Sequence, residues 1–169
     1  LACSVLRPAL QAAEAFTVEP SGNATAWTVK YAGRPIMVYA FRPDTFKPYV
    51  QQLCTIDGDN VLRDAPHDHL HHHALMYAIS VNGLNFWEEI SGSGVEKPVR
   101  TSPPELGTTA DGSPQARLKQ TLHWLAPQDA FLPNDPKHAL LVEQRTLTLT
   151  LDPAGKEVDL EWTSDFTVG

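Results

Sequence analysis

Cysteine is scarce in this chain, which has two in 169 residues, at Cys3 and Cys54. A scaffold held by several disulfides is therefore excluded. If residues 1–15 are removed as a leader, Cys54 is left alone and no disulfide can form within the chain. Cys54 ends an apolar segment just before an Asp57-Gly58 turn, and no dedicated cationic partner is near it apart from a histidine-rich loop. We predict a small core residue rather than a catalytic thiol.

Basic residues and long apolar segments are also few. The chain has 13 Lys and Arg against 20 Asp and Glu, a formal net charge of −7. This balance provides no basic stripe to neutralise phosphates, so neither nucleic acid nor an anionic membrane surface is an expected partner. No apolar run approaches the roughly 20 residues that a membrane-spanning helix needs, so no transmembrane segment is predicted.

Several catalytic signatures are missing. The chain has no Gly-x-Ser-x-Gly elbow for a serine nucleophile, and Ser91-Gly92-Ser93-Gly94 indicates a flexible loop instead. Apolar residues recur at the helical period over no segment of useful length, so a glycine-rich phosphate loop would have no helix to lead into. Acyl transfer through serine and nucleotide binding are both disfavoured.

The amino-terminal segment resembles the end of an export signal. Residues 1–6 are largely apolar, Pro8 interrupts any helix, and Ala13-Glu14-Ala15 has the small-x-small form that signal peptidase favours. We therefore predict a signal-peptide remnant over residues 1–15 and a periplasmic or extracellular protein. Leu1-Ala2-Cys3-Ser4 also resembles the end of a bacterial lipoprotein box, which gives a lipid anchor at Cys3 as the second interpretation. A plain disordered tail or frayed helix is the third.

The remaining residues alternate between apolar and polar side chains, the pattern of half-buried strands. Predicted strands cover residues 27–31, 36–41, 49–56, 75–81, 84–90, 116–124, 140–151 and 158–163. Asn82-Gly83 is a strong hairpin signal, and residues 91–113 are predicted to form one long loop. The expected fold is an all-β antiparallel sandwich in one domain, residues 16–169. The chain ends without a cap or turn, so we expect this domain to be truncated at its carboxyl end.

Histidine is concentrated in one stretch. Five of the seven histidines (His67, His69, His71, His72 and His73) lie beside Asp64 and Asp68. Imidazole titrates near neutrality and is the commonest metal ligand, so this density favours acid–base chemistry or coordination. If the backbone is extended, the odd-numbered imidazoles share one side. The alternative is a solvated turn whose rings hydrogen-bond to nearby backbone.

A family resemblance rests on several short motifs. Lys47-Pro48-Tyr49, Asp57-Gly58, Arg63-Asp64, Asp68-His69-Leu70-His71-His72 and Val81-Asn82-Gly83-Leu84-Asn85-Phe86-Trp87 together resemble the PmoA-like, or methane oxygenase PmoA, family of exported bacterial proteins. The resemblance covers residues 30–90 most closely. It departs at His73-Ala74, where the family has Arg-Gly, so the contact made by that arginine is not expected here.

The resemblance implies a β-supersandwich similar to galactose mutarotases and a carbohydrate as the small-molecule or oligosaccharide ligand. In such sites histidine and a carboxylate move protons while aromatic rings stack on the sugar. Carried onto this chain, it makes His69, His71, His72 and Glu88 the candidate catalytic residues, with Asp64, Asp68, His73, Tyr77 and Trp87 as candidate binding residues. Alternation places Glu88 and Glu89 on opposite faces, so only one of them is expected to reach the site.

Metal-dependent chemistry is the alternative, since the family label implies an oxygenase. His69-x-His71 resembles the first cupin metal motif, and the longer histidine run resembles that of metallo-β-lactamase-like hydrolases, although both lack a carboxylate that those motifs contain. A divalent copper, iron or zinc on His69 and His71 would need a further ligand, which His123 or His138 could supply. Each of these two alone is more often solvated. A non-catalytic exported binding module is the third hypothesis.

Overall fold

The alternating segments form strands over most of the chain. The computed structural model describes residues 15–132, 134–152, 154 and 156–169. Its strands are β1 (Phe16–Ser21), β2 (Ala26–Tyr31), β3 (Arg34–Ala40), β4 (Tyr49–Leu53), β5 (Ser80–Val81), β6 (Leu84–Asn85), β7 (Val95–Thr101), β8 (Glu105–Thr108), β9 (Pro114–Leu125), β10 (Ala139–Asp152) and β11 (Glu157–Val168). Two short 3-10 turns, Pro127–Asp129 and Pro136–His138, connect β9 to β10.

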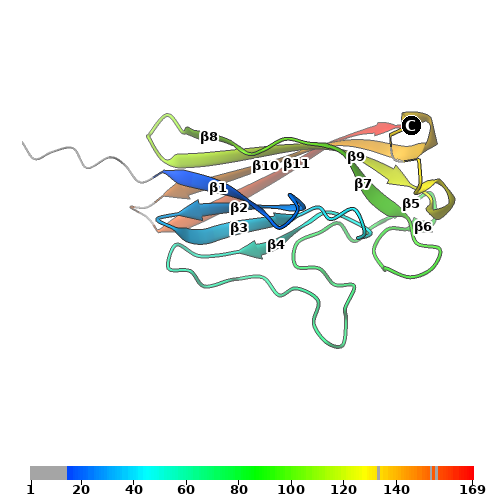
Figure 1. Cartoon of the computed structure of the whole chain (residues 1–169), viewed down its shortest axis with the longest axis horizontal. Helices are drawn as coiled ribbons and strands as arrows, with labels where there is room; N and C mark the ends of the chain where they lie inside the picture. Colours follow the sequence, from blue (N-terminus) through cyan, green and yellow to red (C-terminus); the bar gives the residue numbers. More distant parts are fainter. Residues whose placement is uncertain (1–14, 133, 153, 155) are drawn as a thin grey trace, which may run out of the picture.

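Two antiparallel sheets lie face to face (Figure 1). The first has the order β1-β2-β3-β4, and the second has the order β11-β10-β9-β7 with β8 also paired to β9. A separate two-stranded ladder, β5-β6, is closed by the Asn82-Gly83 turn, where both residues have positive φ. These pairings confirm the predicted all-β antiparallel sandwich.

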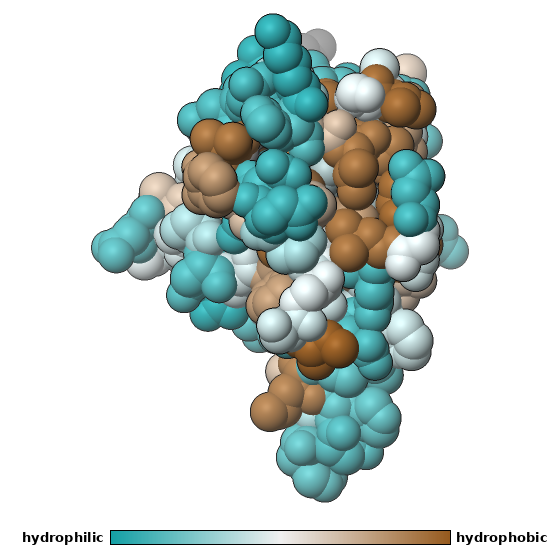
Figure 2. Space-filling model, turned by 90° about the vertical axis from the view of Figure 1, so that its right-hand side faces the viewer, coloured by the Kyte–Doolittle hydropathy of each residue, from teal (hydrophilic) through white to brown (hydrophobic). Residues whose placement is uncertain are grey.

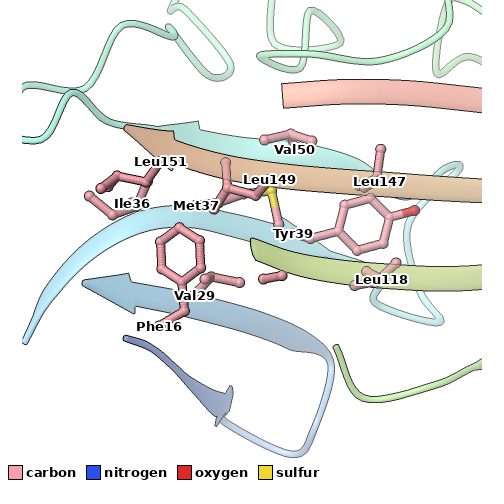
Figure 3. Packing of buried hydrophobic residues seen from close by; sticks show 11 residues of the cluster. Phe16, Val29, Ile36, Met37, Tyr39, Val50, Leu118, Leu147, Leu149 and Leu151 are labelled. Carbon is pink, nitrogen blue, oxygen red and sulfur yellow. The ribbon is translucent and has the colours of Figure 1, made fainter. Parts of the chain in front are cut away.

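The main core lies between the two sheets (Figure 3). Leu147, Leu149 and Leu151 alternate inward from β10 and are fully buried against Val29 and Ile36 of the facing sheet. Each such side chain contributes roughly 1.5 to 3 kcal/mol when it is removed from water. Leucines at every second position therefore hold β10 in register, because a shift by one residue would expose all three.

Charged residues are also buried between the sheets. Arg145 of β10 has no exposed side-chain surface; its Nε and Nη2 donate to Glu143 at 2.7 and 2.9 Å, and Nη2 also donates to Glu96 at 2.9 Å. Its Nη1 donates to the hydroxyl of Tyr39 at 3.0 Å and to the carbonyl of Pro48 at 3.2 Å. One guanidinium thus joins both sheets, with all five of its N–H donors used.

Aromatic rings surround this buried guanidinium. Arg145 lies 4.5 Å from the ring centre of Trp162 and 5.6 Å from that of Tyr77. The indole of Trp124 donates to Glu143 at 2.8 Å, and Ser164 donates to the same carboxylate at 2.5 Å. The aromatic shell shields the ion pairs from water, and the indole and hydroxyl each add a hydrogen bond to Glu143. Among the described residues, Oε1 of Glu96 is buried without a hydrogen-bond partner.

The predicted loop over residues 91–113 is wrong, because it contains β7 and β8. Two features of β7 interrupt the alternation of apolar and polar residues by which strands were predicted. Its inward position 96 is a glutamate paired with Arg145, and Pro98 interrupts the pattern in a strand at the sheet edge, where proline is tolerated. β1 was likewise not among the predicted strands.

The predicted strand over residues 84–90 is also too long, since only Leu84 and Asn85 pair. The carbonyl oxygen of the Asn85 side chain accepts from the backbone nitrogens of Trp87 and Glu88 at 2.7 and 3.1 Å, which turns the chain. Gly94 then passes directly over the buried Phe86, because a Cβ at this glycine would lie 2.5 Å from the phenyl ring.

The surface is not uniformly polar. Figure 2 shows apolar side chains gathered in a strip on the end of the molecule that carries β5, β6 and the carboxyl terminus. Large exposed apolar side chains of the described residues include Ile79, Ile90, Phe131, Phe166 and Val168. At the other extreme, β11 forms an edge of its sheet and exposes Glu157, Asp159, Glu161 and Asp165 along one face.

Candidate functional site

The histidine-rich segment belongs to a long connection that runs back along β4. Val61 donates to Leu53 at 2.9 Å, and Val50 and Leu75 exchange two backbone hydrogen bonds of 3.0 and 3.2 Å. Between these anchors the chain turns twice, with His69 donating to Pro66 and His72 donating to His69. The expectation of an extended segment with alternating imidazoles is therefore wrong.

His73 is the most enclosed histidine of this segment, with 10% of its side chain exposed. Its Nδ1 lies 2.9 Å from Oδ1 of Asp64, and its Nε2 lies 3.2 Å from Oε1 of Glu89. The ring also stacks on Tyr49 at a centroid distance of 4.1 Å. One imidazole thus bridges two carboxylates while an aromatic face fixes its plane.

Residues of β4 complete the polar contacts of Asp64. Its Oδ2 accepts from the hydroxyl of Tyr49 at 3.3 Å and from Nε2 of Gln51 at 3.1 Å. Tyr49 and Gln51 point to the same side of the strand because they are two residues apart. The sheet therefore positions Asp64, and Asp64 in turn orients His73.

Lys47 lies behind Glu89 with 1% of its side chain exposed. Its ammonium donates to the backbone carbonyl of Trp87 at 2.5 Å and lies 3.8 Å from Oε1 of Glu89. Burial lowers the pKa of Lys47, and the charges of Glu89 and Glu96 oppose this effect. The lysine holds the backbone of Trp87 against the start of β4 and supplies a second cation near Glu89.

The pKa of His73 is raised. Burial alone would lower this pKa, but the contacts with Glu89 and Asp64 favour the imidazolium and outweigh it. Glu89 Oε1 is buried and, among the described residues, has no aligned hydrogen bond despite its short distance from His73. The arrangement therefore places a proton donor beside a partly exposed carboxylate.

The raised pKa makes a prediction about stability. Because the folded protein holds the His73 proton more tightly than the unfolded chain, its contribution to the free energy of unfolding is complete below pH 6.5 and is lost as pH rises through the folded pKa. Urea unfolding between pH 5.5 and 8.5 should show that the stability of His73→Gln is below that of wild type at low pH and approaches it as pH rises. His67→Gln is the control, because the His67 side chain is 90% exposed, and its stability should depend on pH in the same way as that of wild type. An NMR titration that gives His73 a pKa at or below 6.5 contradicts the assignment.

Three other imidazoles gather around Trp87. His72 stacks on the indole at a centroid distance of 5.6 Å, His69 stacks on His72 at 4.7 Å, and His71 meets His72 edge-on at 4.5 Å. Loss of hydration and the charges of His71 and His69 lower the pKa of His72. Trp87 keeps 41% of its surface exposed. The three imidazoles and the indole therefore form one cluster of aromatic rings, two residues along the chain from Glu89.

Comparison with known proteins assigns a family to the chain. Residues 26–168 match a family described as Family of unknown function (DUF6807), which covers most of the chain. The chain belongs to the DUF6807 family. No curated protein and no solved structure matches it. Among the described residues there is no helix long and apolar enough to cross a membrane. The PmoA-like resemblance and the export signal stay predictions, and residues 1–14, including Cys3, lie outside the described part of the chain.

Three other candidate residues of this DUF6807 chain do not contact His73. Glu88 does not join the imidazoles; its Oε2 accepts from Asn85 at 2.8 Å, and it is Glu89 that reaches His73. Asp68 lies 3.3 Å from His69 on the exposed side of the turn. Tyr77 is partly buried against the aromatic shell, with its ring centre 5.7 Å from that of Trp124, and its contacts are with this shell rather than with the imidazoles.

The two outlying histidines do not complete a metal site with the loop. His123 was expected to be solvated on the polar side of its strand, but it is 4% exposed, flanked in register by Lys97 and Val142. His138 lies 3.3 Å from Asp129. Across the described residues no group of three or more His, Cys, Asp or Glu side chains is arranged to hold a metal ion. Metal binding through His69 and His71 stays a prediction that metal analysis of untagged protein can test.

Lys47, Tyr49 and Gln51 were not predicted as site residues. Tyr49 and Gln51 follow the alternation of a strand whose outward face would ordinarily be solvated, so the pattern gives no hint that Asp64 returns to cover them. The expectation that Cys54 is a small core residue is confirmed, since it is a buried free thiol.

Proposed function

We propose that the chain binds a carbohydrate at the surface formed by Trp87, His73, Asp64 and Glu89, and that His73 and Glu89 provide acid–base chemistry on it. The observation that carries the proposal is the position of an exposed indole two residues from a carboxylate that contacts a largely enclosed imidazole. Sugar sites combine an aromatic face for the apolar side of the ring with a few fixed polar groups for its hydroxyls.

The polar groups have complementary roles. His73, with its raised pKa, donates a proton or hydrogen bond, while Glu89, whose side chain is 19% exposed, accepts from a ligand hydroxyl through the carboxylate oxygen that faces away from His73. Asp64 keeps the imidazole oriented through Nδ1, and Lys47 keeps Glu89 and Trp87 in place from behind. A ligand hydroxyl at the exposed edge of Glu89 would meet a carboxylate that already contacts the imidazole.

Calorimetric titration with a panel of mono- and oligosaccharides tests this proposal. Trp87→Ala should weaken binding by about 10- to 100-fold, since an aromatic contact worth roughly 1.5 to 3 kcal/mol is removed. Phe131→Ala is the matched control, because it removes an exposed aromatic ring on the β9–β10 connection and should leave affinity unchanged. Absence of binding to every sugar in the panel overturns the proposal.

Turnover separates an enzyme from a binding module. If the site catalyses a reaction on the bound sugar, Glu89→Gln should lower kcat by about 10²- to 10⁴-fold with a much smaller effect on affinity. Glu88→Gln is the matched control, because Glu88 contacts Asn85 instead of His73. Binding without turnover in wild type identifies a non-catalytic module.

A further inference from the structure

A hollow lies beside Arg42 and Gln51, which contact Tyr49 and Asp64 of the His73 site. The cavity has a volume of about 160 Å³ and is lined by Ser21, Gly22, Thr25, Ala26, Ala40, Arg42 and Gln51. At roughly 30 Å³ per water molecule, this is room for about five non-hydrogen groups. A carboxylate together with the carbon and hydroxyl next to it would fit.

Two alanines create this hollow. Ala26 of β2 and Ala40 of β3 are direct partners in the ladder and are both buried, so two methyl groups form the floor where larger side chains would fill the space. The β1–β2 turn forms the rim, held by a 2.9 Å hydrogen bond from the backbone of Phe41 to the carbonyl of Thr25. The rim is polar, since Ser21 and Thr25 contribute hydroxyls.

Arg42 provides the charge of the cavity. The hydroxyl of Tyr49, at 3.5 Å, is its hydrogen-bond partner, and within the described part of the chain Arg42 forms no ion pair with a carboxylate. A guanidinium has five donors in a planar fork that matches a carboxylate, so most of its donors remain for a ligand.

Gln51 complements Arg42 and links the cavity to the site. Its Nε2 donates to Asp64, so the carbonyl side of the same amide is what remains for a ligand hydroxyl. The Tyr49 hydroxyl contacts both Arg42 and Asp64. The ion pair with His73 at 2.9 Å offsets part of the charge that Asp64 would present to a bound anion.

We infer that the cavity binds the carboxylate and neighbouring hydroxyl of an acidic sugar, with the carboxylate on Arg42 and the hydroxyl on Gln51. This inference rests on the proposed carbohydrate function and narrows its ligand class to sugar acids of the uronate type. Arg42 is then a specificity residue, whereas Trp87 and Glu89 act on any sugar that binds.

The test compares glucuronate with its neutral isostere glucuronamide by calorimetry. Wild type should bind glucuronate about 10- to 100-fold more tightly, the range expected for a charge-assisted hydrogen-bonded pair. Arg42→Gln should abolish this preference while leaving glucuronamide affinity unchanged. Arg34→Gln removes the same charge at the exposed opposite end of β3 and should keep the preference. Ala26→Val fills the floor of the cavity without changing its charge, and it should reduce the preference for glucuronate.

A second measurement is independent of sugar binding. Glycolate, phosphate and sulfate are titrated while the Nε–H NMR signal of Arg42 is followed, and glycolate should saturate the shift at the lowest concentration. Equal affinity for glucuronate and glucuronamide overturns the inference and leaves the proposed function intact. A glycolate shift without binding of any sugar supports the anion cavity and overturns the proposed function. A stronger response to phosphate or sulfate, or no response to any anion, overturns the carboxylate assignment.

Discussion

Arg145→Met should lower the free energy of unfolding by about 3 to 5 kcal/mol, the cost measured when one partner of a buried ion pair is removed. The methionine fills a similar volume, but Glu143 and Glu96 are left in the core without their cation, and Tyr39 loses a donor. Urea unfolding at neutral pH measures the loss. Arg145→Lys should also destabilise the protein, because an ammonium cannot make the two-pronged contact with Glu143.

Two further variants show whether the loss arises from uncompensated charge. Adding Glu143→Gln to Arg145→Met should recover part of the stability, because the second change removes a buried carboxylate that no longer has a partner. Arg117→Met is the control for loss of an arginine from the same sheet, since Arg117 is exposed on β9, and it should change stability by less than about 0.5 kcal/mol. If Arg145→Met unfolds at the same urea concentration as wild type, the buried ion pairs of Arg145 do not stabilise the fold.

Glu96→Gln should change how stability depends on pH. Burial raises the pKa of Glu96 to about 7, with Arg145 opposing the shift and Glu143 adding to it. The folded protein therefore holds a proton that the unfolded chain releases near pH 4.5, so stability falls as pH rises from 4.5 through 7. A shift of this size corresponds to about 3 kcal/mol. The glutamine keeps an acceptor for Arg145 and cannot ionise, so it should not show this loss.

The measurement is the difference in free energy of unfolding between Glu96→Gln and wild type from pH 5 to 9. The difference should favour the variant increasingly with pH and level off above pH 8. Titrating groups remote from Glu96 contribute equally to both proteins and cancel. Glu105→Gln serves as the control, because Glu105 is exposed and its curve should follow wild type. Parallel curves for Glu96→Gln and wild type would show that Glu96 is ionised in the fold throughout this range.

The sequence predicted strands correctly where the buried side chains are apolar and the exposed ones are polar. Leu147, Leu149 and Leu151 alternate inward as predicted, and Asn82-Gly83 turns between two short strands. The same alternation continues back through Arg145 and Glu143, which share the inward face and are buried. Because charged residues ordinarily mark the solvent side, the pattern alone did not indicate that this part of β10 faces the core.

The sequence indicated the segment that forms the candidate site but not which residues contact one another there. The density of histidine identified the segment, and the structure brings His69, His71 and His72 together around Trp87. The choice between Glu88 and Glu89 depends on the turn that Asn85 makes, which shifts both away from simple strand alternation. The contribution of Lys47 depends on a contact 40 residues away along the chain, beyond the reach of any local pattern.

The acidic face of β11 affects how copies of the molecule meet. A twelve-residue strand at a sheet edge presents unpaired backbone groups that could join those of a second molecule into a continuous sheet. Glu157, Asp159, Glu161 and Asp165 recur at every second or fourth position, so strands from two copies would bring rows of like charge together. Repulsion between these acidic rows opposes association of the protein through β11. High salt screens this repulsion and so lowers the colloidal stability of the protein.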